Sequence, residues 1–293
     1  MILNKISSLK EKLNLEDTKS VCIMDNNFMS FLVELKKEID ISYIFLNYDF
    51  ILIPKWVYVE ISDSEYRKSC LEEISIYKDV YIVDELEYSE LYDYKDYSLV
   101  MLFIASIHLM ARERGKLTQV IKKQGEEIDP NIFIDELYNN ILVSEGNMTK
   151  SGRLKRKNAG EISICVLSHI IRYNYTNIDN IVIFSFDSDC YDFVQNSKEI
   201  LYSKKSIFFD EENYFKGQRK ISATFKSNDF ILKEMYDLGK DNNMEIIDKV
   251  RKNERYVKYT RKKTDGSIEE EKEYMNTEDF KIFIKKDNVH LIF

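Results

Sequence analysis

Short apolar segments, each followed by a helical pattern, constrain the fold of this chain more than any other feature. Residues 20–24, 50–53, 80–83 and 180–186 are apolar runs of strand length. Strands that alternate with helices build a parallel sheet, since each crossover returns the chain to the same end of the sheet. We therefore expect an α/β fold with a central, mostly parallel sheet flanked by helices.

Helical spacing of apolar residues fills most of the sequence between these strands. The predicted helices lie at 2–15, at 28–38, from Pro54 onward, at 161–173 and at 189–200, and a further short strand is expected at 207–209. Two longer helices, at 97–114 and 130–143, would form a helical insertion of about 85–150.

Beyond residue 215 the pattern becomes rich in β-strand signals. Asp265-Gly266 is a strong turn signal and predicts a hairpin over 254–275. A second hairpin, about Asp287-Asn288, is expected from 280–285 and 289–293. We therefore divide the chain into a domain of residues 1–214 and a C-terminal extension of residues 215–293.

Five acidic residues stand where predicted strands end or helices begin. They are Asp25, Glu60, Glu161, Asp187 and Asp189. Open α/β folds place their sites at this rim of the sheet. Carboxylates gathered there repel one another and stay ionised together only around a cation. All-oxygen ligands favour Mg²⁺ or Mn²⁺, which activate water for displacement at phosphorus. The acids therefore predict a metal-dependent phosphodiesterase, that is, a nuclease.

Four short motifs, in order along the chain, resemble those of the PIN-domain nucleases. They are Asp25 with Asn27, Pro54 with Val57 and Glu60, Gly160-Glu161, and Ser185-Phe186-Asp187 with Asp189. Two features depart from the family pattern. Phe186 occupies a position where Asn is common, and the gap between Glu60 and Glu161 is far longer than in compact members, which implies the insertion of about 85–150.

The resemblance implies a PIN-like three-layer fold and an endoribonuclease. In that family's pattern Asp25, Glu60, Glu161 and Asp187 would hold one or two Mg²⁺ or Mn²⁺ ions. Asp189 would be a further metal ligand or would orient the attacking water. Asn27 and Ser185 would support these acids. The choice of RNA over DNA rests on the resemblance alone.

A basic loop precedes Glu161 and contains Arg153, Lys155, Arg156 and Lys157. In a PIN-like fold it would border the acidic site and contact the phosphates of nucleic acid. A solvated loop is the alternative explanation. Many PIN-like enzymes are toxins or defence effectors held in check, so the resemblance also implies an inhibitory or regulatory protein partner.

Other interpretations of the same residues stay open. Asp25 could only cap the following helix, and Glu161 could only favour a positive helix N-terminus. A strand ending in Asp187-Ser188-Asp189 also occurs in HAD-type phosphatases and Toprim nucleases, although neither setting matches closely. A further alternative is a catalytically inert PIN-like module that binds nucleic acid or protein.

The formal net charge of −8 argues against a protein that merely coats nucleic acid. Four cysteines without a C-x-x-C pair indicate buried, reduced thiols in a cytoplasmic protein. The first residues start an amphipathic stretch rather than a signal peptide, and the longest apolar run is too short to span a bilayer. No membrane partner is expected.

Overall fold

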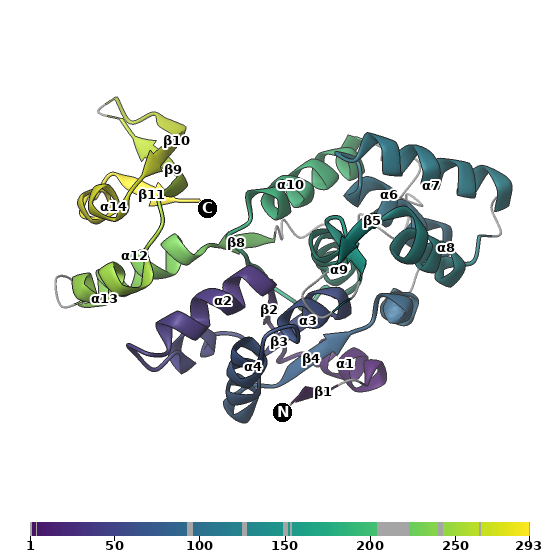
Figure 1. Cartoon of the computed structure of the whole chain (residues 1–293), viewed down its shortest axis with the longest axis horizontal. Coiled ribbons are helices and arrows are strands. Elements are labelled where there is room, and N and C mark those ends of the chain that lie inside the picture. The colour runs from purple at the N-terminus through teal and green to yellow at the C-terminus, as the bar shows by residue number, and fades with distance from the viewer. Residues whose placement is uncertain are drawn as a thin grey trace.

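The computed structural model describes most of the chain, and its centre is a parallel sheet. The described residues are 2–3, 5–92, 96–124, 128–148, 152, 154–203, 223–239, 243–263 and 265–292. Six strands lie in the order β1-β4-β3-β2-β7-β8, and every neighbouring pair is parallel (Figure 1). The strands are β1 (Ile2–Leu3), β2 (Ser20–Met24), β3 (Phe50–Pro54), β4 (Val80–Val83), β7 (Asn180–Phe184) and β8 (Thr224–Lys226). The predicted α/β fold with a central parallel sheet is confirmed.

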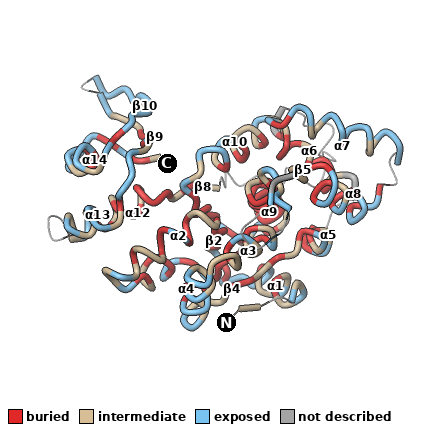
Figure 2. The backbone as a smooth tube through the Cα atoms, viewed as in Figure 1, coloured by how far each residue is buried: buried red, intermediate tan, exposed pale blue. Residues whose placement is uncertain are grey.

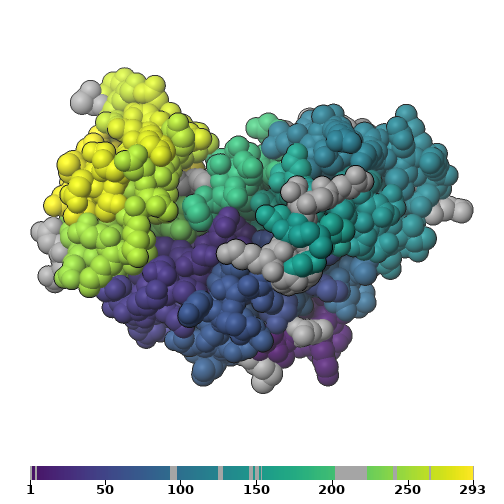
Figure 3. Space-filling model, viewed as in Figure 1, coloured from purple at the N-terminus to yellow at the C-terminus, as the bar shows by residue number. Residues whose placement is uncertain are grey.

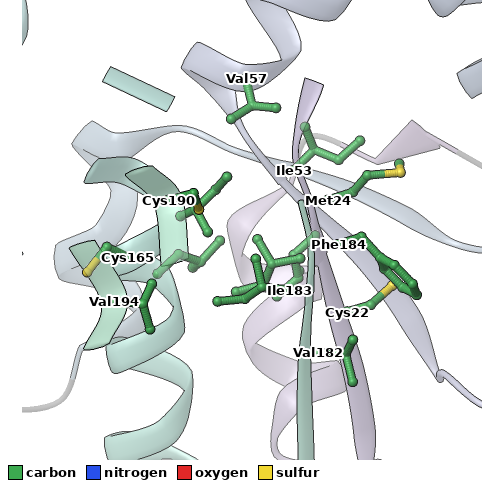
Figure 4. Close-up of a cluster of buried hydrophobic side chains, with 14 of the residues drawn as sticks. Cys22, Met24, Ile53, Val57, Cys165, Val182, Ile183, Phe184, Cys190 and Val194 are labelled. Atoms are coloured by element: carbon green, nitrogen blue, oxygen red, sulfur yellow. The ribbon is translucent and has the colours of Figure 1, made fainter. Parts of the chain in front are cut away.

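Helices cover both faces of this sheet. Ile183 of β7 faces Cys165 on α9 (Ala159–Asn174) and Cys190 on α10 (Ser188–Ser203), whereas Phe184 points to the opposite face (Figure 4). There the Phe184 ring lies 4.6 Å, centroid to centroid, from that of Phe28 on α2 (Asn26–Leu35). This alternation is the period of two of a strand that is buried on both sides. All four cysteines are free and buried, as expected.

Three more helices come from the N-terminal part of the chain. They are α1 (Ile6–Leu13), α3 (Lys55–Ile61) and α4 (Glu65–Tyr77). The predicted helix over 2–15 is shorter than expected, because Ile2 and Leu3 pair with β4 as a strand. Helix α3 follows Pro54, as predicted, and α4 was not predicted. Figure 2 shows buried backbone concentrated in the sheet and in the helices against it.

The predicted insertion of about 85–150 is helical at its centre and ends in a hairpin. Its helices are α6 (Asp96–Ser106), α7 (Ala111–Gln124) and α8 (Pro130–Glu136), which continues into a π-helical turn, η3 (Leu137–Ile141). The single helix predicted over 97–114 is wrong: the buried Ile107 and Met110 turn the chain between α6 and α7. The segment after η3 forms the strand β5 (Val143–Met148), and it pairs antiparallel with β6 (Leu154–Arg156), which lies in the predicted basic loop.

The described part of the C-terminal unit consists of three helices and a three-stranded sheet. Its elements are α12 (Asn228–Gly239), α13 (Met244–Val250), β9 (Arg255–Lys262), β10 (Ile268–Met275), α14 (Thr277–Phe283) and β11 (Val289–Leu291). The predicted hairpin about Asp265-Gly266 is confirmed, with Gly266 at φ +83°. In Figure 3 this unit (yellow-green) and the helical insertion (teal) lie on opposite sides of the molecule.

The second hairpin predicted in this unit is wrong. Residues 280–285 are mostly helical, because the Asn276 side chain caps α14 at the Asp279 amide and the Phe280 and Phe283 rings are buried. Strand β11 pairs antiparallel with β9 instead. Strand β8, which comes after residue 215, belongs to the central sheet. The strand predicted at 207–209 lies outside the described residues.

Candidate functional site

Asp25 lies directly after β2, at the edge of the sheet where the parallel strands end. Its main-chain amide continues the ladder by donating to the Phe184 carbonyl of β7 at 2.9 Å. The side chain is 5% exposed. Oδ1 accepts from the Asn26 amide at 2.7 Å, which caps α2, and Oδ2 accepts from the Ser185 hydroxyl at 2.8 Å. Asp25 therefore caps a helix and faces the end of the neighbouring strand.

The turn after β7 holds two more of the predicted acids next to Asp25. The Ser185 hydroxyl accepts from the Asp187 amide at 3.1 Å, and the Asp187 Oδ1 accepts from the Asp189 amide at 2.8 Å. The Asn27 side-chain Nδ2 donates to the Asp187 Oδ2 at 3.3 Å. Asn27 and Ser185 thus connect the turn to β2 and α2, the supporting position predicted for them.

Glu60 and Glu161 come from two helices that pack closely together. Glu60 is the sixth residue of α3, and Glu161 is in the first turn of α9. A Cβ atom added at Gly160 would stand only 3.2 Å from the Val57 Cγ2. The absence of a side chain at Gly160 therefore lets α3 and α9 approach, and this approach places the two glutamates in one electrostatic neighbourhood.

Burial and mutual repulsion raise the pKa of three of these acids. The pKa of Asp25 is raised to about 7, mainly by burial and also by the charges of Glu60 and Asp187, while the Ser185 hydrogen bond opposes the rise. Burial and the Glu161 charge raise the pKa of Glu60 to about 7. Burial, followed by the charges of Asp25, Asp187 and Asp189, raises the pKa of Glu161 to about 7. Each of the five acids therefore interacts electrostatically with at least one other.

Glu60 is exposed by its accessible surface area, although enough protein atoms lie around its carboxylate to raise its pKa. Both observations fit a residue that faces an open cavity of about 1010 Å³. Of the five acids, Glu60 lines this cavity, between α2, α4 and the β5–β6 hairpin. The cavity wall also contains Arg67, whose guanidinium donates to the Glu60 carbonyl at 2.8 Å. The cavity thus connects solvent to Glu60, and the other four acids are not part of its wall.

The donor chemistry of this cluster suits a hard cation. All five predicted acids offer oxygen ligands, which Mg²⁺ and Mn²⁺ prefer. The Asn26 Oδ1 is buried, accepts no hydrogen bond and lies on a residue that lines the cavity beside Glu60. Within the described residues, however, no group of three or more His, Cys, Asp or Glu side chains is arranged to hold a metal ion. The acids share a neighbourhood without forming a closed ligand set.

The basic residues predicted to bind nucleic acid have different positions. Lys155 is exposed on β6 and lines the cavity, and Lys157 is exposed just after β6. The Arg156 guanidinium donates to the Tyr138 carbonyl at 2.7 Å and stacks 4.0 Å from the centre of the Trp56 ring. Arg156 therefore braces the hairpin against η3 and α3. Arg153 lies outside the described residues.

Sequence reasoning missed several residues of this neighbourhood. Arg67 is on α4, and no local motif connects it to Glu60. Glu85 is 2% exposed, and its Oε1 accepts from the Trp56 amide in the first turn of α3 at 3.2 Å. Burial raises the pKa of Glu85 to about 7 as well. An acidic residue after the apolar strand 80–83 was the available signal for Glu85.

No protein-family model, curated protein or solved structure matches this chain. Within the described residues, no helix is both long enough and apolar enough to cross a membrane. Function therefore has to be inferred from the chemistry of the site.

Proposed function

We propose that the protein is a PIN-like, metal-dependent endoribonuclease that hydrolyses RNA phosphodiester bonds with Mg²⁺ or Mn²⁺. One observation carries this proposal. Each of five carboxylates near one end of a parallel sheet interacts electrostatically with at least one other, and the pKa values of three rise to about 7. A protein has little reason to gather repelling carboxylates at this edge unless a cation offsets their charge.

The acids would hold the ion, and the polar residues around them would keep the acids in place. Asp25, Glu60, Glu161 and Asp187 would be ligands, with Asp189 as a further ligand. A bound Mg²⁺ or Mn²⁺ would lower the pKa of water and offset the negative charge that builds up on the phosphate. Ser185 and Asn27 hold Asp25 and Asp187 by hydrogen bonds. The unpaired Asn26 Oδ1 offers another neutral oxygen.

The cavity offers an entrance for a polyanion to this acidic cluster. Among the described residues, its wall contains three cations, Arg67, Lys155 and Arg156, and four acids, Glu34, Glu60, Asp63 and Glu65. Lys155, which is exposed, is the residue we expect to contact a substrate phosphate. In a chain with a net charge of −8, such local cations are needed to bring an anion towards the carboxylates.

A catalytically inert PIN-like module is the second candidate. The absence of a closed metal-ligand group among the described residues favours it. Such a module would keep the fold and the cavity but would bind nucleic acid or a protein without cutting. The two candidates differ in whether divalent metal binds and whether cleavage depends on Asp25.

The deciding experiment compares the wild-type protein with Asp25→Asn on single-stranded RNA, structured RNA and DNA. Each substrate is incubated with Mn²⁺, with Mg²⁺ or with EDTA. Asp287→Asn is the matched control, because Asp287 lies in an exposed turn of the C-terminal unit. We expect metal-dependent RNA cleavage by wild type and by Asp287→Asn, and a loss of about a hundredfold or more in Asp25→Asn.

Two other outcomes have clear meanings. Cleavage of DNA alone would keep the metal site and overturn the choice of RNA. A wild-type protein that neither cuts nor binds Mn²⁺ by calorimetry would sink the nuclease and support the inert module.

A further inference from the structure

The three-stranded sheet of the C-terminal unit has one buried face and one open face. Val257 and Tyr259 of β9 are buried, and the Tyr259 ring centroid lies 4.5 Å from that of Phe283 on α14. Alternate residues of a strand point to opposite faces, so Tyr256 and Lys258 point away from this core. Their cross-strand neighbours on β10 are Tyr274 and Lys272. We call these four residues the open face.

Two tyrosines of the open face leave most of their surface in solvent. Tyr256 is 61% exposed and Tyr274 is 54% exposed, although their ring centroids are only 4.9 Å apart. A cross-strand aromatic pair stabilises a hairpin through the part of each ring that its neighbour covers. The exposed remainder offers flat π surface on which a base can stack. Figure 2 shows the neighbouring β10 backbone as exposed.

The charge on this face favours an anion. Lys272 stands directly opposite Lys258 in the register of the hairpin, an arrangement of like charges that repel. The Lys272 Nζ lies 4.8 Å from the centre of the Tyr256 ring. Glu270 pairs with Lys258 at 2.6 Å, so one carboxylate faces these two cations. A phosphate group between the tyrosines and the lysines would remove the remaining repulsion.

The open face adjoins the turn that contains two acids of the candidate site. The Lys258 Nζ lies 4.5 Å from the centre of the Tyr191 ring, two residues after Asp189. The Arg255 guanidinium, at the start of the same strand, lies 5.7 Å from the ring of Phe186, next to Asp187. A strand of nucleic acid could therefore continue from the acidic cluster onto the C-terminal sheet.

We propose that the open face is a stacking platform for single-stranded nucleic acid. Tyr256 and Tyr274 stack on unpaired bases, and Lys272 and Lys258 contact the phosphates between them. A duplex is a poor ligand for this face, because its bases already stack on one another and are not available to side chains. This inference rests on the proposed function for its class of ligand, and it adds a binding surface outside the acidic site.

Binding of a fluorescently labelled oligouridylate to the full chain, measured by anisotropy in EDTA, tests the platform. EDTA prevents cleavage, so binding is read without catalysis. We expect the Tyr256→Ala/Tyr274→Ala variant to bind at least about thirtyfold more weakly than wild type, because stacking on both rings is lost. The matched Tyr256→Phe/Tyr274→Phe variant keeps both rings and should bind within about threefold of wild type. A duplex of equal length should bind weakly to all three proteins.

The platform is overturned if wild type does not bind the oligonucleotide, or if the alanine variant binds as tightly as wild type. Equal losses in the alanine and phenylalanine variants would also overturn it, since ring stacking would then not matter. Thermal unfolding confirms that each variant is folded. Failure of the nuclease proposal gives a different pattern. The wild-type protein then binds the oligonucleotide without cutting RNA, and the alanine variant still binds more weakly than wild type. Failure of the platform alone leaves metal-dependent cutting intact and binding unchanged.

Discussion

Asp25 combines a structural role with the role proposed for it in the site. Its Oδ1 caps α2 at the Asn26 amide, and its Oδ2 accepts the Ser185 hydrogen bond. Asparagine is an equally good N-cap residue, and its side-chain NH2 group can donate a hydrogen bond to the Ser185 hydroxyl oxygen. Asp25→Asn therefore removes a charge from the cluster while it keeps the cap. This makes it a cleaner test of the site than Asp25→Ala.

The raised pKa values of Asp25, Glu60 and Glu161 predict how stability changes with pH in the absence of divalent metal. Each pKa is about 7 in the folded protein, against ordinary values of 3.8 for Asp and 4.5 for Glu. The folded state therefore holds protons that the unfolded chain has released. The stability that these three groups contribute is fully present below about pH 4, and this contribution is lost as the pH rises through about 7. We expect the melting temperature in EDTA to fall by about 4–8 °C between about pH 5 and pH 8, mainly through Asp25 and Glu161, because solvent screens the exposed Glu60.

The same measurement with added metal and with a variant identifies the cause of this pH dependence. Mn²⁺ should restore the melting temperature at the higher pH, because a cation offsets the charges that repel. Asp25→Asn should show a smaller fall between the two pH values, since one titrating group is absent. A wild-type protein that melts at the same temperature at both pH values, or higher at the upper one, contradicts the prediction.

At the scale of elements, the contact between α3 and α9 decides whether Glu60 and Glu161 meet. Gly160 and Val57 form this contact, and a Cβ atom at position 160 would lie only 3.2 Å from the Val57 Cγ2. We expect Gly160→Val to lower the free energy of unfolding by about 1–3 kcal/mol, because the added methyl groups push the two helices apart. Urea unfolding measures this loss, and Mn²⁺ affinity should fall with it if the glutamates are ligands.

A second substitution separates crowding from other effects at Gly160. Val57→Ala alone should destabilise, because Val57 is fully buried. In Gly160→Val/Val57→Ala the smaller residue makes room for the larger one. The double variant should therefore be more stable than the sum of the two single losses predicts. Additive losses would show that helix crowding is not the reason for glycine at this position.

Elements with a strong local signal could be predicted from the sequence, and those that depend on distant partners could not. Strands β2, β3, β4 and β7 are apolar runs, and four of the five acids follow these strand ends or begin helices, whereas Glu60 is the sixth of the seven residues of α3. Helix α14 was predicted as a strand, because its burial depends on Tyr259 across the sheet. Arg156 was predicted to contact phosphate, but its bonds to η3 belong to tertiary structure. Arg67 donates to the Glu60 carbonyl across the turn between α3 and α4, a contact that no apolar pattern indicates.

At the scale of the whole molecule, a buried ion-pair cluster connects the C-terminal unit to the turn after β7. Asp229 on α12 is 3% exposed. Its carboxylate accepts from Arg251 at 3.0 Å and from Arg255 at 3.1 Å. Arg251 also donates to the Met275 carbonyl at 3.1 Å, so the cluster connects α12 to β9 and β10. Arg255 then extends from this cluster to the ring of Phe186 beside Asp187.

Asp229→Ala should destabilise the C-terminal unit by about 3–5 kcal/mol, because the buried Arg251 would lose its counter-ion. The matched control on the same helix is Asp237→Asn, whose exposed pair with Lys233 should be worth less than about 1 kcal/mol. Limited proteolysis measures the effect: Asp229→Ala should be cut faster within residues 223–292 than wild type, and Asp237→Asn should not. If Arg255 keeps the turn after β7 in place, Mn²⁺ affinity should also fall in Asp229→Ala. An Asp229→Ala protein that resists protease as well as wild type would show that the unit is held by its apolar core rather than by this ion-pair cluster.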